Sequence, residues 1–252
     1  MLTLSELKRM AARGGVPQAI VEKDYSLSVA LKALAGSELA QRCVFKGGTA
    51  IRKAYFKEAR YSEDLDFTAI SMEKADCLRL LRAALEGRTA EGIAFADIEE
   101  VKTAAGLKAA VKYLGPLSHA QRIRFDFSFR DNLVEKPKER ELIDYYNLGP
   151  AKMQVLGIEE IFAEKLHALV SRSAPRDLYD VWFLLGKGVK VDSKVLERKF
   201  AFYNENFDAK KAIDNARKSE EEWKRDLQPL LKTLPDYKKV ESEVEKGLGL
   251  LL

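Results

Sequence analysis

Asp64 and Asp66 are the side chains in this sequence best placed for chemistry, because they stand two residues apart in a segment with strand character. The segment Asp64-Leu-Asp-Phe67 alternates polar and apolar residues, so on a strand both carboxylates point to one face and the apolar side chains point into the core. Two carboxylates on one face can share one or two hard divalent cations, which prefer oxygen ligands. The same spacing also fits solvated residues of an edge strand, and Asp-x-Asp occurs in glycosyltransferases as well.

A second strand-like segment, residues 123–129, carries one more carboxylate. Its residues alternate so that Ile123, Phe125, Phe127 and Phe129 share one face, while Arg124, Asp126 and Ser128 share the other. By itself Asp126 fits an ordinary half-exposed strand. Beside Asp64 and Asp66, it would supply the third carboxylate of a two-metal phosphoryl-transfer site.

The turn Lys46-Gly47-Gly48-Thr49 has the residue types of a phosphate-binding loop. It follows a short predicted strand at 42–45 and opens a helix that starts at residue 50. Glycines let the backbone approach a ligand, the first N–H groups of a helix bind phosphate, and Thr49 adds a hydroxyl. A plain strand-to-helix turn is the alternative. The order of strand, Gly-Gly-Thr, helix and Asp-x-Asp strand favours the triphosphate site.

Further phosphate contacts are expected from the residues around this turn. Lys46 belongs to a basic stretch, residues 42–60, in which six lysines and arginines occur with a single acid, Glu58. Such a cluster can collect the phosphates of a triphosphate or of RNA, although charge runs are also common on solvated helix faces. Ser62 fits either a phosphate contact or a residue that holds the turn before Asp64.

Three charged residues in the second half of the chain are placed by helical spacing. Lys165 falls within the apolar stripe of a helix predicted over 158–171, where a lysine either extends its ammonium to solvent or directs it into an adjoining cleft. Asp177 and Asp180 are three residues apart on the next helix and are therefore neighbours on one face. A surface ion pair between Arg176 and Asp180 accounts for the same residues without a function.

These residues are carried by an α/β half followed by a helical half. Helices are predicted over 4–12, 17–35, 50–57 and 73–86, and strands over 42–45, 64–69, 108–114 and 121–130. After about residue 150 the pattern predicts helices alone, over 158–171, 175–185, 193–204, 208–217, 219–233 and 236–247. We therefore expect a catalytic domain over residues 1–150 and a helical domain over residues 151–252 that completes the active-site cleft.

Composition excludes several classes of protein. The chain has 252 residues, 46% hydrophobic and 33% charged, with a net charge of +4, which fits a globular protein with either an RNA or a small-molecule partner. Two cysteines, Cys43 and Cys77, cannot form a disulfide framework or a cysteine zinc site. With only His119 and His167 as histidines, the carboxylates must carry the chemistry. No apolar run reaches the roughly 18 residues of a membrane span, and the N-terminus lacks the apolar region of a signal peptide, so we expect a cytoplasmic protein without a membrane partner.

Several segments of the chain occur together, in this order, in one known family. They are Val21-Glu-Lys-Asp-Tyr25, Phe45-Lys-Gly-Gly-Thr-Ala-Ile51, Arg60-Tyr-Ser-Glu-Asp-Leu-Asp-Phe67, Glu159-Glu-Ile-Phe-Ala-Glu-Lys-Leu-His-Ala168 and Arg176-Asp-Leu-Tyr-Asp180. On these segments the sequence resembles the AbiEii/AbiGii-type nucleotidyltransferase toxins, which include the mycobacterial MenT toxins. The resemblance covers roughly residues 17–186.

The resemblance implies a fold, a cofactor and a substrate. The fold is that of a nucleotidyltransferase, an α/β domain whose mixed sheet carries the carboxylates, followed here by a C-terminal helical bundle. The cofactor is Mg²⁺ or Mn²⁺, which we expect on Asp64, Asp66 and Asp126. The substrate is a nucleoside triphosphate, and in the MenT branch the acceptor is the 3′ end of tRNA. Relatives are often the toxin of a toxin–antitoxin pair, so a cognate antitoxin is a further expected partner.

The resemblance also implies roles for the later residues. Lys165 becomes a catalytic lysine that neutralises charge in the transition state, and Asp180 becomes an active-site carboxylate that orients Lys165 or the nucleotide. Arg176 and Asp177 are expected near the nucleotide.

Two other functions fit the same core. One is a small-molecule nucleotidyltransferase of the antibiotic-modifying type, and the other is a catalytically silent module that binds a nucleotide or RNA. The intact Asp64-x-Asp66 pair argues against the silent module, because a silent site is free to lose its metal ligands. A glycosyltransferase leaves Gly47-Gly48-Thr49 unexplained.

Overall fold

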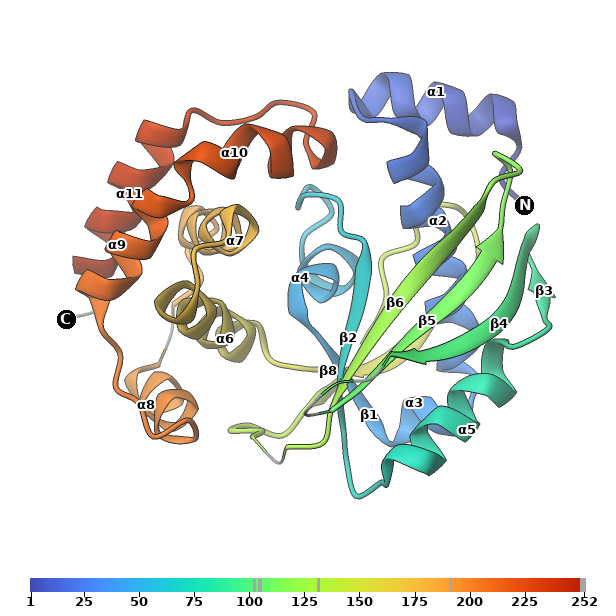
Figure 1. Ribbon diagram of the computed structural model, residues 1–252, viewed down its shortest axis with the longest axis horizontal. Coiled ribbons are helices and arrows are strands. Elements are labelled where there is room, and N and C mark those ends of the chain that lie inside the picture. Colours follow the sequence, from blue (N-terminus) through green and yellow to red (C-terminus); the bar gives the residue numbers. More distant parts are fainter. Residues whose placement is uncertain (102, 104–105, 131, 191, 250–252) are drawn as a thin grey trace. The chain divides into compact units, whose positions relative to one another are not determined.

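The computed structural model describes residues 1–101, 103, 106–130, 132–190 and 192–249, and it divides into two compact units (Figure 1). Unit 1 comprises Met1–Asp131 and Pro137–Leu156, and unit 2 comprises Asn132–Lys136 and Gly157–Leu252. Unit 1 therefore contains the expected α/β half, and unit 2 contains the helical half together with a short segment from between two strands.

Unit 1 is built on the mixed sheet that the sequence analysis predicts. Among the described residues, eight strands pair in the order β3-β4-β5-β6-β2-β1-β8-β7. In that order they are Thr89–Ala90, Ile93–Val101, Leu107–Leu114, Ala120–Ser128, Asp64–Ala69, Cys43–Lys46, Lys152–Val155 and Lys138–Glu141. β2 runs parallel to β6 and β1 parallel to β8, whereas the other neighbouring strands are antiparallel.

The two faces of the central strands differ in polarity, as their alternating sequences require. On one face Leu65, Phe67, Phe125 and Phe127 are at most 1% exposed, and the three rings stack with centroids 5.2 to 6.4 Å apart. Helices α2 (Gln18–Ala35) and α5 (Lys74–Leu85), which contact each other as well as the sheet, lie on this apolar side (Figure 1). The opposite face of β2 and β6 is therefore the one that presents the aspartates.

The remaining helices of unit 1 are short or locally capped. α1 (Leu4–Gly14) begins with a capping box, in which the Thr3 hydroxyl accepts from the Glu6 N–H and the Glu6 carboxylate accepts from the Thr3 N–H. α3 spans Glu38–Gln41. The single helix expected over 50–57 is instead a short α4 (Gly47–Ala50) that continues as a π-helical turn, η1 (Ile51–Tyr55).

Unit 2 is helical. Its helices are α6 (Ile158–Ser171), α7 (Pro175–Gly186), α8 (Ser193–Ala201), α9 (Ala209–Lys218), α10 (Glu220–Leu227) and α11 (Tyr237–Gly249), with a 3₁₀ turn, η2 (Gln228–Leu230), after α10. α6 is its centre, because it contacts α7, α8 and α9. In the described part of the chain, every helix is too short or too polar to cross a membrane.

Two parts of the sheet differ from the sequence-based expectation. The stretch after residue 150 is not helical throughout, because β8 (Lys152–Val155) pairs in parallel with β1 and belongs to unit 1. Unit 1 therefore extends to Leu156, and the main part of unit 2 begins at Gly157. The strands β3, β4 and β7 were also not predicted.

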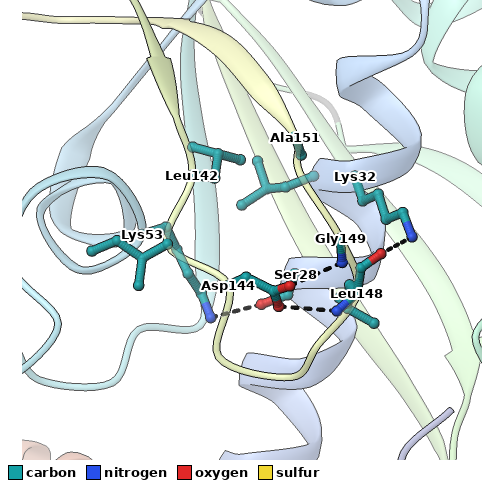
Figure 2. Close-up of a pocket in the computed structure, with 10 residues that line it drawn as sticks. Ser28, Lys32, Lys53, Leu142, Asp144, Leu148, Gly149 and Ala151 are labelled. Atoms are coloured by element: carbon teal, nitrogen blue, oxygen red, sulfur yellow. Dashed lines mark hydrogen bonds between the residues drawn. The ribbon is translucent and has the colours of Figure 1, made fainter.

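A buried ionic cluster around Asp24 joins α2 to η1. The Asp24 carboxylate lies 2.7 Å from the Lys53 ammonium and 3.1 Å from Nε of Arg52, and it accepts a 2.6 Å hydrogen bond from the Tyr146 hydroxyl. Asp24 and Lys53 are 1% exposed or less, and the Lys53 ammonium also donates a 2.8 Å hydrogen bond to the Ser28 hydroxyl of α2 beside a small pocket (Figure 2). Burial raises the pKa of Asp24, but the charges of Lys53 and Arg52 outweigh burial and hold this pKa below its ordinary value. The helical turn that follows Gly47-Gly48-Thr49 is therefore held by charge as well as by packing.

We predict that Asp24→Ala lowers the free energy of unfolding by about 3–5 kcal/mol, because it leaves two buried cations without their carboxylate. Asp76→Ala is the matched control. Asp76 pairs with Arg79 at 3.0 Å in an exposed position, where such a pair contributes less than about 1 kcal/mol. Urea unfolding of both variants measures the difference, and equal midpoints would contradict a stabilising role for the cluster.

Candidate active site

One row of charged side chains crosses the sheet at the middle of β2. The strand register aligns Lys46 of β1 with Asp66 of β2, Asp66 with Asp126 of β6, and Asp126 with Lys108 of β5. Residues in register on neighbouring strands share a face, so the two aspartates stand side by side between two lysines. The Lys108 ammonium lies 3.2 Å from the Asp126 carboxylate.

Asp64 lies one step along the same face, in register with Arg124 of β6. The sequence analysis did not single out Lys23 of α2, whose charge interacts with that of Asp64. Burial lowers the pKa of the Lys23 ammonium, and the nearby carboxylates of Glu63 and Asp64 oppose that change. Lys23 donates a hydrogen bond to the carbonyl of Arg122 and lies 5.1 Å from the ring centroid of Tyr113.

Gly47 is in direct contact with Asp66. Its φ of +75° is in the left-handed region that favours glycine. A Cβ at this position would lie 2.9 Å from the carboxyl carbon of Asp66, and nearer still to Oδ2. The missing side chain thus lets the aspartate carboxylate lie against the backbone of the Gly-Gly-Thr turn, and the two expected parts of the site meet here.

Thr49 and Ser62 connect the same turn to the start of β2. The Thr49 side chain is buried, with its hydroxyl 2.7 Å from that of Ser62 and in a hydrogen bond with the carbonyl of Asp64. Both hydroxyls therefore hold the turn against the strand of the aspartates. Gly48, the middle residue of the Gly-Gly-Thr turn, is half-buried.

The oxygen donors on this face have the chemistry that Mg²⁺ or Mn²⁺ requires. Asp64 and Asp66 are half-buried carboxylates on one face of β2, and hard divalent cations prefer such ligands. In the described part of the chain, however, no group of three His, Cys, Asp or Glu side chains is arranged to hold a metal ion. Asp126 instead pairs with Lys108, so a three-carboxylate centre stays a prediction that requires Asp126 to exchange this partner.

In unit 2, Lys165 lies in a compact cluster of charges. Its ammonium is 2.9 Å from Oδ1 of Asp177 and 2.8 Å from Oδ2 of Asp180, and its side chain is only 13% exposed. It therefore neither extends freely into solvent nor lies unpaired. Nε of Arg172 donates to the other oxygen of Asp177 at 2.8 Å. Burial raises the pKa of Asp177, but the charges of Lys165 and Arg172 outweigh it and lower this pKa to about 2.

The other cations that the sequence analysis assigned to phosphate binding are Arg176 and those of the stretch 42–60. Arg176 is half-buried in the first turn of α7, one residue before Asp177. The basic stretch 42–60 is not an open surface, because Arg52, Lys53 and Arg60 are at most 6% exposed. Half of the cations expected to collect phosphates are therefore enclosed within unit 1.

Known proteins of similar structure share the fold of this chain. A solved structure with the same arrangement is that of MenT4, a nucleotidyltransferase toxin from Mycobacterium tuberculosis H37Rv, with a TM-score of 0.82, 20% sequence identity, and coverage of 100% of this chain and 90% of that one. An antigenic nucleotidyltransferase-like protein from Paracoccidioides brasiliensis is more distant, with a TM-score of 0.47, 15% identity, and coverage of 83% and 94%. No curated protein matches the chain.

The sequence matches the model of one protein family over most of its length. Residues 29–246 match the model of the nucleotidyl transferase AbiEii toxins of type IV toxin–antitoxin systems. This range includes the Gly-Gly-Thr turn, the Asp64–Asp66 pair and the Lys165 cluster, and the mixed sheet with its helices is the fold shared with MenT4. The chain is therefore a nucleotidyltransferase that belongs to the AbiEii toxin family.

Proposed function

We propose that this enzyme transfers a nucleotidyl group from a nucleoside triphosphate to RNA, at the 3′ end of tRNA, with Mg²⁺ or Mn²⁺ as cofactor. The observation that carries the proposal is the contact between Gly47 and Asp66, which joins a phosphate-type turn to the carboxylate pair. In the reaction a terminal hydroxyl of the acceptor attacks the α-phosphorus, a new P–O bond forms, and pyrophosphate leaves.

In this proposal the residues of unit 1 divide into two groups. Asp64 and Asp66 hold the metal, and Asp126 either joins them or accepts the proton of the attacking hydroxyl. The bound cation would supply neutralisation of charge that develops on the phosphate oxygens. The backbone of Gly47 and Gly48, at the start of a helix whose first N–H groups lack helical partners, binds the triphosphate with Lys46. Thr49 and Ser62 keep that backbone at a fixed position relative to β2.

We propose that Lys165 serves the same reaction by neutralising negative charge in the transition state. The 2.8 and 2.9 Å contacts support a positioning role for Asp180 and Asp177, since each fixes the ammonium in one place. Arg176 is proposed to contact the nucleotide. That the helical unit completes the cleft remains part of the proposal.

The biological setting extends the proposal. We propose that the enzyme acts in the cytoplasm as the toxin of a toxin–antitoxin pair, and its membership of a family of type IV toxins supports the existence of a cognate antitoxin. Incubation with each labelled triphosphate, Mg²⁺ and total RNA, followed by gel separation, tests activity, donor and acceptor together. Label on a small acceptor alone would favour the antibiotic-modifying type, and binding without any transfer would favour a silent module.

For the carboxylate pair, we predict that Asp64→Asn and Asp66→Asn each abolish transfer and leave the melting temperature within a few degrees, because both residues lie on the polar face of β2. Asp97→Asn is the control, since Asp97 is an exposed carboxylate of β4. Labelled-nucleotide incorporation and a melting curve measure both quantities. Wild-type turnover in either β2 variant would remove that residue from the metal site.

For the glycine turn, we predict that Gly47→Ala removes most of the activity by displacing the Asp66 carboxylate. Gly87→Ala is a close control, because Gly87 has a φ of +71° but nothing within 4 Å of an added Cβ. Both variants carry the cost of a left-handed alanine, roughly 1–2 kcal/mol. Only Gly47→Ala also moves a proposed ligand, so equal activities of the two folded variants would refute the role of this contact.

For the lysine, we predict that Lys165→Met loses both stability and rate. Stability falls because two buried carboxylates lose their shared cation, at a cost of about 3–5 kcal/mol. The rate per folded molecule falls about 10²–10³-fold, the value of one preorganised electrostatic contact.

Lys199→Met separates the two effects. Lys199 is 1% exposed and pairs with Glu160 at 2.7 Å and Glu164 at 3.0 Å, so its loss should destabilise the protein in the same way. Turnover is measured at a temperature where both variants are folded. Full turnover of folded Lys165→Met would restrict Lys165 to a structural role.

A further inference from the structure

Beside the aspartate pair, the exposed face of β5 and β6 carries four cations. The register places the side chains of Lys112 and Arg122 next to each other, Arg124 one step closer to the aspartates, and Lys108 beside Asp126. We call these four side chains the basic face. Lys108, Arg122 and Arg124 are exposed and Lys112 is half-buried, while the opposite side of the same strands is packed with Val111, Ile123 and Phe125.

The cations differ in how far they are already neutralised. Lys108 pairs with Asp126 at 3.2 Å, and Glu99 of β4 lies 2.5 Å from Lys112 and 3.7 Å from Arg122. Arg124 is exposed, and none of the hydrogen bonds or ion pairs among described residues uses its side chain. Its neighbour in register on β2 is Asp64. An open guanidinium next to a proposed metal ligand is suited to hold a phosphate close to the reacting end of an acceptor.

We propose that the basic face binds successive phosphates of the RNA acceptor and leads its end toward Asp64 and Asp66. This inference rests on the proposed function and adds the path that the acceptor follows. From Arg122 to Asp126 the strand rises about 13 Å, longer than a single phosphate group, so the face suits a polynucleotide better than a small molecule. The exposed side of β5 and β6 bears no aromatic side chain on which a base could stack. Binding therefore depends on the phosphates and is insensitive to sequence.

The test compares two changes with opposite expected effects, both away from the proposed metal ligands. Lys112→Gln with Arg122→Gln removes two cations. At 0.1 M salt each phosphate contact of a single strand contributes about fivefold in affinity, from a salt slope of about 0.7 per contact. The KM for tRNA and its dissociation constant should rise about 25-fold, and the salt slope should fall by about 1.4. Glu99→Gln releases the same two cations from their carboxylate and should tighten binding and lower KM.

Affinity is measured by fluorescence anisotropy with end-labelled tRNA and no triphosphate, and KM and kcat by incorporation of labelled nucleotide. The control is Lys74→Gln with Arg79→Gln, two exposed cations of α5 on the helical side of unit 1. It removes the same net charge, and its KM should match that of the wild type. kcat should be unchanged in all three variants.

The outcomes separate the two claims. If the wild type labels RNA but the Lys112/Arg122 variant keeps its KM and salt slope, the basic face is not the acceptor path and the proposed function stands. An equal loss in the Lys74/Arg79 control would also overturn the proposal, since net charge alone would then account for the binding. If the wild type transfers label to no RNA, the proposed function fails and this inference fails with it.

Discussion

The contact between the Gly47 backbone and the Asp66 carboxylate is the constraint on which the candidate site depends. β1 and β2 are antiparallel neighbours, so the turn after β1 returns beside the aspartates of β2. Any side chain at residue 47 would enter the space that Asp66 occupies. The glycine is thus required by an acid nineteen positions later in the sequence. The proposed phosphate-binding turn lies against the proposed metal ligand because the turn follows β1 and the ligand is on β2, its neighbour in the sheet.

In each unit a buried ionic cluster fixes a helical segment or a loop in place. In unit 1, Asp24 fixes the π-helical turn through Arg52 and Lys53. In unit 2, Glu160 binds Lys199 and accepts hydrogen bonds from the N–H groups of Val134 and Glu135, which attaches the segment 132–136 to the helices. Removing one member of such a cluster leaves a buried charge, so these residues are under strong structural constraint whatever the reaction.

The sequence predicted the elements with clear periodicity and missed those defined by pairing. β2 and α6 have the predicted bounds, because alternation and the apolar stripe are both strong there. β7 consists of four charged, exposed residues, Lys-Glu-Arg-Glu, and lacks the alternation of polar and apolar residues by which a strand is predicted from sequence. β8, Lys-Met-Gln-Val, alternates over only four residues, and it is a strand because it pairs with β1 and β7. The basic stretch 42–60 was interpreted as surface because nothing nearby in sequence shows that Asp24 neutralises part of it.

The same limit applies within the site. The residue types and strand faces of Asp64, Asp66 and Asp126 followed from alternation, but their neighbours did not. Lys108 and Arg124 become part of the site only through the register of β5, β6 and β2, which depends on long-range pairing. If the register of these strands had been known in advance, it would have indicated both Lys108 and Arg124.

A crystal structure with Mg²⁺ and a non-hydrolysable nucleoside triphosphate analogue would test the proposed site most directly. We expect a cation on the carboxylates of Asp64 and Asp66, with the triphosphate along the backbone of Gly47 and Gly48. Movement of Asp126 away from Lys108 toward the cation would complete the three-carboxylate centre. A triphosphate bound elsewhere, with Asp64 and Asp66 distant from the metal, would contradict the assignment of these two aspartates as metal ligands and of the glycine turn as the triphosphate site.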